Sequence, residues 1–286
     1  MLIAVCSLTG APGVTTWTVA LAACWPQPAR TVLIECDPSG GSLAARFGLA
    51  SAPGLVSLAA AARRDTTPGL LWSHTQALPG GLPGGRRDGL PVVAAPPGAD
   101  YTRAALHTLL DSRASVSVLR GVAAQGAVVI ADCGRLDSTS PALAIAREAD
   151  QVLLLARPLA DELTTLAAGL SMVDLWSMRP GLLLAGAGYP ASEVARNLGI
   201  PVLAVVPHDP RGVRGLCGQS SSRRSRLGRT ARAVAAQLSS PSTGALLPAA
   251  GHERPVEHTG PRFELWQAIR PAPGSTTASN GRRGTA

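Results

Sequence analysis

Short, continuously apolar runs alternate along the chain with longer segments of helical periodicity. Continuous apolar runs are typical of strands in a sheet covered on both faces, and helical segments between them favour parallel pairing. The pattern therefore predicts an α/β fold, a three-layer, doubly wound, mostly parallel sheet. The expected strands are Leu2–Cys6, Thr31–Glu35, Leu90–Ala95, Ala127–Ala131, Gln151–Ala156, Leu182–Ala185 and Val202–Val206. The expected helices lie near Thr15–Ala23, Tyr101–Ala124, Ser140–Glu148, Ala160–Ser177 and Ala191–Leu198, with an Arg-rich helix after Val206.

Two segments interrupt this alternation. The Gly- and Pro-rich stretch from Leu78 to Gly89 predicts a loop or an edge insertion. The chain beyond residue 238 is rich in Ser, Pro, Gly and Thr, a composition that predicts a disordered tail. We therefore expect one domain over residues 1–238 and a disordered C-terminal tail over residues 239–286.

One short stretch of the tail, residues 262–270, has an amphipathic pattern. Phe263, Trp266 and Ile269 recur at three-residue spacing, so a helix would place them on one face. Such a face can lie on a membrane surface, bind a protein partner or dock back onto the domain. Because so short a helix is marginal in isolation, docking onto a partner or the domain is favoured over membrane-surface contact.

Composition narrows the class of protein. The chain has 286 residues of which 46% are hydrophobic and only 3% aromatic, so we expect a full core built from Leu, Val, Ala and Ile. The five cysteines are widely spaced with no CxxC pair, which argues against a disulfide framework or a zinc site. We see neither a signal peptide nor an apolar run of about 20 residues that could cross a membrane. These features predict a cytoplasmic protein.

The positive charge is concentrated in one segment. The chain contains no lysine, and seven arginines without an acid lie between Arg211 and Arg232, against a net charge of +8 for the whole sequence. This segment is a candidate for non-specific contact with DNA phosphates. The alternative is an Arg-rich helix face that keeps a nearly neutral domain soluble. Because no aromatic residue is interleaved, base stacking is not supported.

A glycine-containing loop follows the first predicted strand and precedes the first predicted helix. In such a loop backbone N–H groups and a helix N-terminus converge on phosphate oxygens, and a lysine before the Ser/Thr adds charge at the β- and γ-phosphates. Here Val14 stands in the lysine position. The alternative is an ordinary tight turn between strand and helix. The loop reads Leu8-Thr9-Gly10-Ala11-Pro12-Gly13-Val14-Thr15-Thr16.

Acidic residues follow two of the predicted strands. Glu35 and Asp37 come at the end of the second strand, and Asp132 follows the apolar run Val128–Ala131, which is the form of a Walker B segment. Ligands of open α/β sheets bind at the carboxyl ends of the strands. Asp132 can hold Mg²⁺ through water while Thr15 offers its hydroxyl to the same ion.

In this order and spacing, the segments resemble the ParA/MinD family of deviant-Walker P-loop ATPases. The resemblance continues through Val152–Pro158, Gly188–Leu203 and Pro207–Pro210, and so covers about residues 1–238. It implies a P-loop NTPase-like fold that binds ATP and Mg²⁺. It also implies a homodimer and an unidentified protein partner.

The family pattern Lys-Gly-Gly-x-Gly-Lys-Thr-Thr falls on Thr9 to Thr16. Thr9 replaces the signature lysine, which in the family reaches across a nucleotide-sandwich dimer, and Val14 replaces the P-loop lysine. The resemblance implies that Asp37 positions the attacking water and that Thr15 and Asp132 bind Mg²⁺. It implies nucleotide contacts for Gly10, Ala11, Pro12, Gly13, Val14, Thr15 and Thr16, and for Pro207 and His208 in the base loop.

The loss of both lysines predicts a degenerate Walker A motif. Positive groups must meet the charge on the transferred phosphoryl group, so hydrolysis should suffer more than binding. We therefore expect a nucleotide-binding protein of the partitioning or cell-organisation type, with weak or absent ATP hydrolysis, that acts through partners. One alternative is an active ATPase in which an arginine such as Arg135 supplies the charge. Another is a nucleotide-free scaffold.

Overall fold

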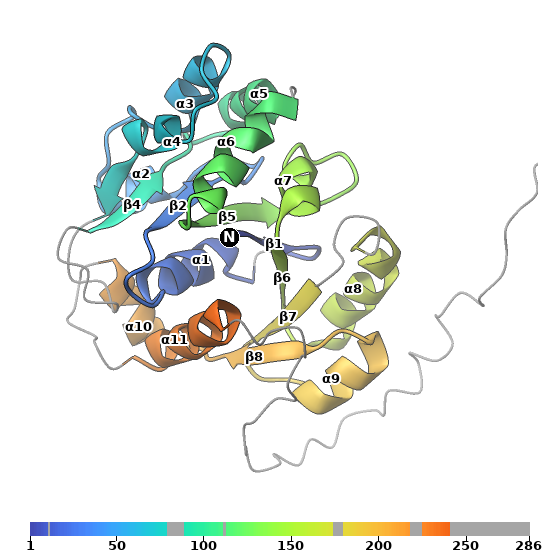
Figure 1. Ribbon diagram of the computed structural model, residues 1–286. Helices are drawn as coiled ribbons and strands as arrows, with labels where there is room; N and C mark the ends of the chain where they lie inside the picture. The colour runs from blue at the N-terminus through green and yellow to red at the C-terminus, as the bar shows by residue number, and fades with distance from the viewer. Residues whose placement is uncertain (11, 79–88, 111–112, 174–179, 218–224, 241–286) are drawn as a thin grey trace, which may run out of the picture. The chain divides into compact units, whose positions relative to one another are not determined.

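The computed structural model describes residues 1–10, 12–78, 89–110, 113–173, 180–217 and 225–240 (Figure 1). The strands of this part form an eight-stranded sheet in the order β3-β4-β2-β5-β1-β6-β7-β8. Neighbouring strands are parallel except β3, which pairs antiparallel with β4 at one edge. The strands are β1 (Leu2–Ser7), β2 (Thr31–Glu35), β3 (Gln76–Leu78), β4 (Leu90–Val93), β5 (Val128–Arg135), β6 (Gln151–Ala156), β7 (Pro180–Ala185) and β8 (Val202–Val206).

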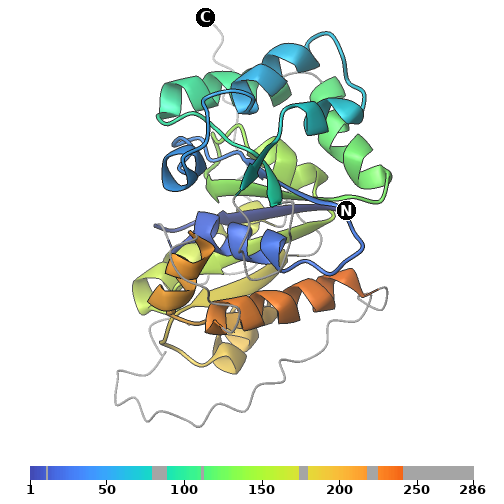
Figure 2. The same ribbon diagram turned by 90° about the vertical axis from the view of Figure 1, so that its left-hand side faces the viewer.

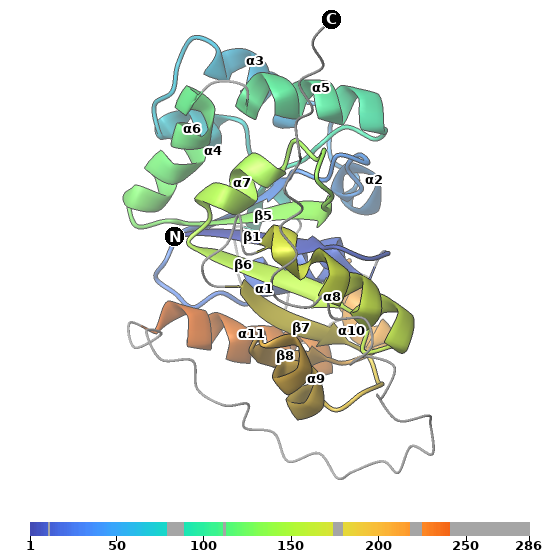
Figure 3. The same ribbon diagram turned by 90° about the vertical axis from the view of Figure 1, so that its right-hand side faces the viewer.

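Helices cover both faces of the sheet, as the continuous apolar strands require. Helices α1, α10 and α11 lie on one face (Figure 2), and α6, α7 and α8 lie on the other (Figure 3). The predicted three-layer α/β fold is therefore confirmed. The helices are α1 (Val14–Ala23), α2 (Leu43–Phe47), α3 (Leu55–Ala62), α4 (Gly69–Ser73), α5 (Ala99–Leu110), α6 (Arg113–Ala124), α7 (Leu143–Glu148), α8 (Ala160–Val173), α9 (Ala191–Leu198), α10 (Pro210–Leu216) and α11 (Arg226–Ser239).

Each of the seven predicted strands is present, but several elements differ from the expectation. Strand β5 continues through Asp132 to Arg135, because its ladder with β1 extends to the pair Ser7–Arg135. The helix expected over residues 101–124 is two helices, α5 and α6. The edge strand β3 and the short helices α2, α3 and α4 were not predicted, since each has five residues or fewer or lacks a clear period.

The core on the α1 face is made almost entirely of aliphatic side chains, as the composition predicts. Helix α1 is buried along most of its length between the sheet and α11. Trp17, only 1% exposed, is the largest fully buried side chain among the residues that the structure describes. Helix α11 begins at an N-cap, Ser225, whose hydroxyl accepts a hydrogen bond from the Gly228 N–H at 2.9 Å, and it packs its apolar face on this core.

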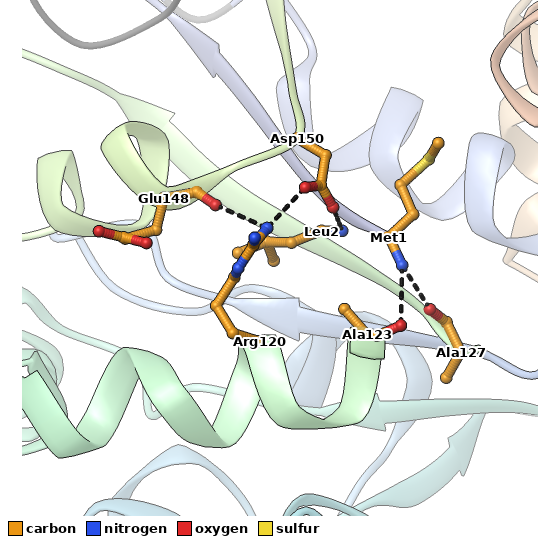
Figure 4. Close-up of polar contacts among 7 residues, drawn as sticks. All are labelled: Met1, Leu2, Arg120, Ala123, Ala127, Glu148 and Asp150. Carbon is orange, nitrogen blue, oxygen red and sulfur yellow. Dashed lines mark hydrogen bonds and ion pairs between the residues drawn. The ribbon is translucent and has the colours of Figure 1, made fainter. Parts of the chain in front are cut away.

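An ion pair joins α6 to the chain just before β6, at the end of the sheet where β1 and β6 begin (Figure 4). The guanidinium of Arg120 contacts Asp150 Oδ1 at 2.6 Å and donates to the Glu148 carbonyl at 3.1 Å. The other carboxylate oxygen of Asp150 accepts a hydrogen bond from the Leu2 N–H at 2.7 Å. Burial opposes ionisation, but these partners outweigh it and lower the pKa of Asp150. This contact stabilises the end of the sheet at which these strands begin, opposite the candidate site.

Some expectations lie outside the described residues. They are Ala11, most of the loop between Leu78 and Gly89, the tail from residue 241 onward and its stretch 262–270 with Phe263, Trp266 and Ile269. The five cysteines all belong to the described part and form no disulfide, as expected. Within the described ranges, no helix is long and apolar enough to cross a membrane.

Candidate functional site

The loop between β1 and α1 leaves the start of a helix open to solvent. Gly13 is the N-cap of α1 and has a φ of 98°, a left-handed conformation that favours glycine. Gly10 and Gly13 are exposed, and a Cβ added at either position would meet no atom within 4 Å. No side chain caps the helix and no acid lies in its first turn. The free N–H groups and the helix dipole therefore form a site suited to an anion.

Thr9, in the position of the signature lysine, contacts residues of its own chain. Its side chain is buried, and its hydroxyl donates to Glu162 Oε2 at 3.0 Å in the first turn of α8. Its backbone N–H and C=O both bond the Ser7 hydroxyl, at 3.1 and 3.0 Å. Glu162 also accepts from the backbone N–H of Arg157 at 2.9 Å. Thr9 thus ties the loop to the strand β6 side of the sheet.

Val14, in the position of the P-loop lysine, belongs to the hydrophobic core. It is 7% exposed and packs in the cluster that includes Trp17 and residues of α11. Its side chain adds no charge to the loop. What remains available at this position for a phosphate is the backbone N–H. Thr15 and Thr16, the next two residues, are half-buried at the first turn of α1.

Asp132 lies within reach of this turn from the neighbouring strand β5. It is 1% exposed; Oδ1 accepts the Gly134 N–H at 3.1 Å, while Oδ2 has no hydrogen-bond partner within the described residues. Burial raises the pKa of Asp132 to about 7, although the Thr15 hydroxyl, the next largest influence, lowers it and Glu35 and Asp37 raise it. The carboxylate therefore carries an unmet demand for a hydrogen bond or a cation.

Glu35 and Asp37 have different roles at the end of β2. Glu35 pairs in register with Asp132 and is 2% exposed; burial raises its pKa despite three backbone hydrogen bonds. Those bonds come from Ser42 at 2.8 Å, Leu43 at 3.0 Å and Ala95 at 3.0 Å. Glu35 is thus a structural acid that fixes the start of α2.

Asp37 is half-buried, and its Oδ1 accepts the Ser39 N–H at 2.8 Å. Its carboxylate lies against Gly134, where φ is 56° and an added Cβ would overlap the carboxyl group. The same carboxylate raises the pKa of Asp132, and the Thr15 hydroxyl lowers it. Asp37, Asp132 and Thr15 thus lie at the same end of the sheet, while their roles toward Mg²⁺ and the attacking water stay predictions.

The donors at this site suit a divalent cation that is shared with a ligand. Within the described ranges, no group of three His, Cys, Asp or Glu side chains is poised to hold a metal. Mg²⁺ is commonly held by one or two protein groups together with substrate phosphates and water. The orphaned Asp132 Oδ2 and the Thr15 hydroxyl match that donor set.

Three thiols, those of Cys6, Cys36 and Cys133, lie near Asp132 at the ends of β1, β2 and β5. All three are fully buried. Burial raises the pKa of each, and Asp132 raises it further. Protonated thiols of this kind are unreactive and serve as small packing groups.

The predicted base loop follows β8 at the same edge of the sheet. His208 is exposed and Pro207 half-buried. The next residue, Asp209, caps α10 by accepting the Gly212 N–H at 2.9 Å, and it accepts the Leu227 N–H of α11 at 3.1 Å. This carboxylate joins α10 to α11, and the roles of Pro207 and His208 in nucleotide contact stay a prediction.

One cation at the site was missed in the sequence. Arg46, on α2, donates from Nη2 to the Thr16 hydroxyl at 3.3 Å. Arg135, the arginine singled out from the sequence, is exposed at the end of β5 and helps to lower the pKa of Asp137. Because α2 has only five residues and was not predicted, no sequence signal placed Arg46 beside the loop.

The Arg-rich segment forms two helices, α10 and α11, rather than one. The apolar side of α11 is buried against α1, and its arginines lie on the outer side or its margin. Arg223 and Arg224 lie outside the described residues. The side chains that are exposed belong to Arg211, Arg214, Arg226 and Arg229. An amphipathic helix with solvated arginines accounts for this pattern, and DNA contact stays a prediction.

Comparisons with known proteins agree on the fold. No protein-family model matches the chain, and no curated protein matches its sequence. A ParA family ATPase from Chlorobium tepidum has a TM-score of 0.64 at 15% identity, over 82% of this chain and 98% of that one. MinD from Pyrococcus horikoshii, solved with Mg-ADP, has a TM-score of 0.64 at 14% identity, over 86% and 99%.

A third similar structure is cobyrinic acid a,c-diamide synthase from Mycobacterium smegmatis, solved with an ATP analogue and magnesium. Its TM-score is 0.56 at 19% identity, over 87% of this chain and 98% of that one. One fold thus serves more than one activity among these proteins. The resemblance found in the sequence motifs is confirmed at the level of architecture: this chain has the fold of the ParA and MinD P-loop ATPases.

Proposed function

We propose that this chain binds a nucleotide with Mg²⁺ at the β1–α1 loop, as a ParA/MinD-like protein of the partitioning or cell-organisation type. One observation carries the proposal. The uncapped, exposed start of α1 lies beside a buried Asp132 oxygen that has no hydrogen-bond partner among the described residues. A magnesium–phosphate complex would place its phosphates at this anion site and its cation at the Asp132 oxygen that lacks a partner. The solved MinD with Mg-ADP and the synthase with an ATP analogue and magnesium support this choice of ligand.

Hydrolysis by this site is weak or absent. Val14 is packed in the core and Thr9 is bonded to Glu162, so neither lysine position offers a cation to the phosphates. Backbone N–H groups, Mg²⁺ and the helix dipole can hold a nucleotide in its ground state. They supply too little positive charge to stabilise the negative charge that develops on a transferred phosphoryl group.

Such a protein would act through what it binds rather than through turnover. We propose a homodimer and an unidentified protein partner, as the resemblance to the ParA/MinD family implies. The exposed arginines of α10 and α11 are the proposed surface for non-specific DNA contact. Phe263, Trp266 and Ile269 are the proposed contact for a protein partner, with a membrane surface as the less favoured alternative.

An equilibrium titration with a fluorescent ATP analogue and Mg²⁺ tests nucleotide binding. We expect saturation at or below millimolar nucleotide and a loss of affinity when Mg²⁺ is replaced by EDTA. Failure to bind at millimolar nucleotide would leave the nucleotide-free scaffold as the better description. The exposed start of α1 would then be an ordinary turn.

An active ATPase is the second candidate, and Arg46 favours it because this cation contacts the first turn of α1. Phosphate release measured on wild type and Asp37→Ala separates the two candidates. Release in wild type that disappears in Asp37→Ala would support hydrolysis. No release above the blank, together with nucleotide binding, would support the first proposal.

A further inference from the structure

Helix α2 aims an arginine at the candidate phosphate site. The Glu35 carboxylate accepts hydrogen bonds from the backbone N–H groups of Ser42 and Leu43, and Leu43 is fully buried in the core. The helix is therefore fixed at its first turn. Three residues later Arg46 donates from Nη2 to the Thr16 hydroxyl at 3.3 Å.

The guanidinium of Arg46 meets a neutral acceptor rather than an acid. Within the described ranges, the ion pairs are Arg120–Asp150 and Arg157–Glu162, and neither includes Arg46. Arg46 is half-buried, so its charge is partly removed from water without an opposite charge to offset that cost. A guanidinium has five N–H donors in a planar fork and binds phosphate in two-pronged geometry.

The acceptor lies in the first turn of α1, whose N–H groups form the candidate anion site. Thr15 faces Asp132, so the metal side of this turn is the Thr15 side. Arg46 reaches the next residue, Thr16. Arg46 thus approaches the turn at a different residue from the one that faces the metal carboxylate.

We infer that Arg46 is the phosphate-binding cation of this chain, supplied by α2 in place of the absent P-loop lysine. This inference rests on the proposed nucleotide binding and adds its recognition residue. Because Arg46 enters beside Thr16, it contributes to nucleoside diphosphates and triphosphates alike.

The test is calorimetric titration of the full chain with Mg·ADP, Mg·ATP and magnesium tripolyphosphate. Arg46→Ala is compared with Arg46→Lys and with Arg63→Ala, which removes one positive charge from an exposed position at the end of α3. Arg46→Ala should weaken both nucleotides about 10- to 100-fold, the range of a hydrogen bond between charged groups. Arg46→Lys should retain part of the affinity that Arg46→Ala loses, and Arg63→Ala should bind like wild type. Circular dichroism and thermal melting establish that each variant is folded.

The outcomes separate this inference from the proposed function. Wild type that binds both nucleotides, with Arg46→Ala unchanged, overturns the role of Arg46 and leaves nucleotide binding standing. A loss caused by Arg135→Ala instead also overturns it. Binding of tripolyphosphate but not of nucleotides, abolished by Arg46→Ala, supports Arg46 as a phosphate residue and rejects the nucleotide. Wild type that binds none of the three probes rejects both.

Discussion

Restoring a lysine at position 14 should cost stability before it improves binding. Val14 is 7% exposed in the core cluster, and full burial of a valine side chain stabilises a protein by about 1.5–3 kcal/mol. In Val14→Lys the lysine stem can recover part of this only by carrying its ammonium out to the loop. A cation at the positive end of α1 costs roughly another 0.3–1 kcal/mol. We therefore expect a net loss of about 1–3 kcal/mol without nucleotide.

Urea unfolding of wild type, Val14→Lys and the uncharged control Val14→Met measures this loss. The control should lose less than Val14→Lys, because it lengthens the side chain without adding charge. If the lysine reaches the phosphates, the Kd for Mg·ATP should fall below that of wild type, and Mg·ATP at 100 times that Kd should stabilise Val14→Lys by about 2.7 kcal/mol. Val14→Lys as stable as wild type in the absence of nucleotide would show that position 14 is not a core position, and would refute this account of the missing lysine.

Asp150→Asn should lower the free energy of unfolding by about 1 kcal/mol at pH 7, measured by urea unfolding. The effect is small because solvent screens the partly exposed Arg120–Asp150 pair. Since the pKa of Asp150 is lowered on folding, the difference from wild type should shrink as pH falls below about 4. Asp132→Asn should stabilise the metal-free protein in EDTA. Because the folded-state pKa of Asp132 is about 7, the cost of ionising this buried group in wild type grows between about pH 4 and 7. A variant no more stable than wild type above pH 7 would contradict the burial of that charge. Thr9→Val should cost about 1–2 kcal/mol in the same assay because it removes the Glu162 hydrogen bond, and no loss would show that the bond is not formed in solution.

The positions of the strands, but not their order in the sheet, could be predicted from the sequence. Strands β2, β6 and β8 have the predicted bounds, because each is a continuous apolar run flanked by polar residues or proline. The short elements α2, α3, α4 and β3 could not be anticipated. Helices α2 and α4 and strand β3 have five residues or fewer, and α3 lacks a clear apolar period. Helix α2 starts where it does because Glu35, seven and eight residues earlier, accepts hydrogen bonds from the N–H groups of Ser42 and Leu43.

Only part of the candidate site could be predicted from the sequence. Thr15, Asp37 and Asp132 were placed together because the ends of adjacent parallel strands share one edge of the sheet. The positions that lack lysine were recognised, but their present roles were not. That Val14 packs in the core, that Thr9 bonds Glu162 and that Arg46 contacts Thr16 are long-range tertiary facts. A local pattern cannot specify contacts between residues 30 or 153 positions apart.

Binding of Mg·ATP at the β1–α1 loop is the central claim, and a negative charge placed in that loop tests it most directly. Gly10 is exposed and a Cβ added there meets no atom within 4 Å, so Gly10→Glu adds a carboxylate to the anion site with room at its Cβ. Gly69→Glu makes the same change at an exposed, equally open position at the start of α4. Wild type and Gly69→Glu should bind Mg·ATP in equilibrium dialysis while Gly10→Glu loses binding. Equal binding by all three, or none by wild type, would contradict the account.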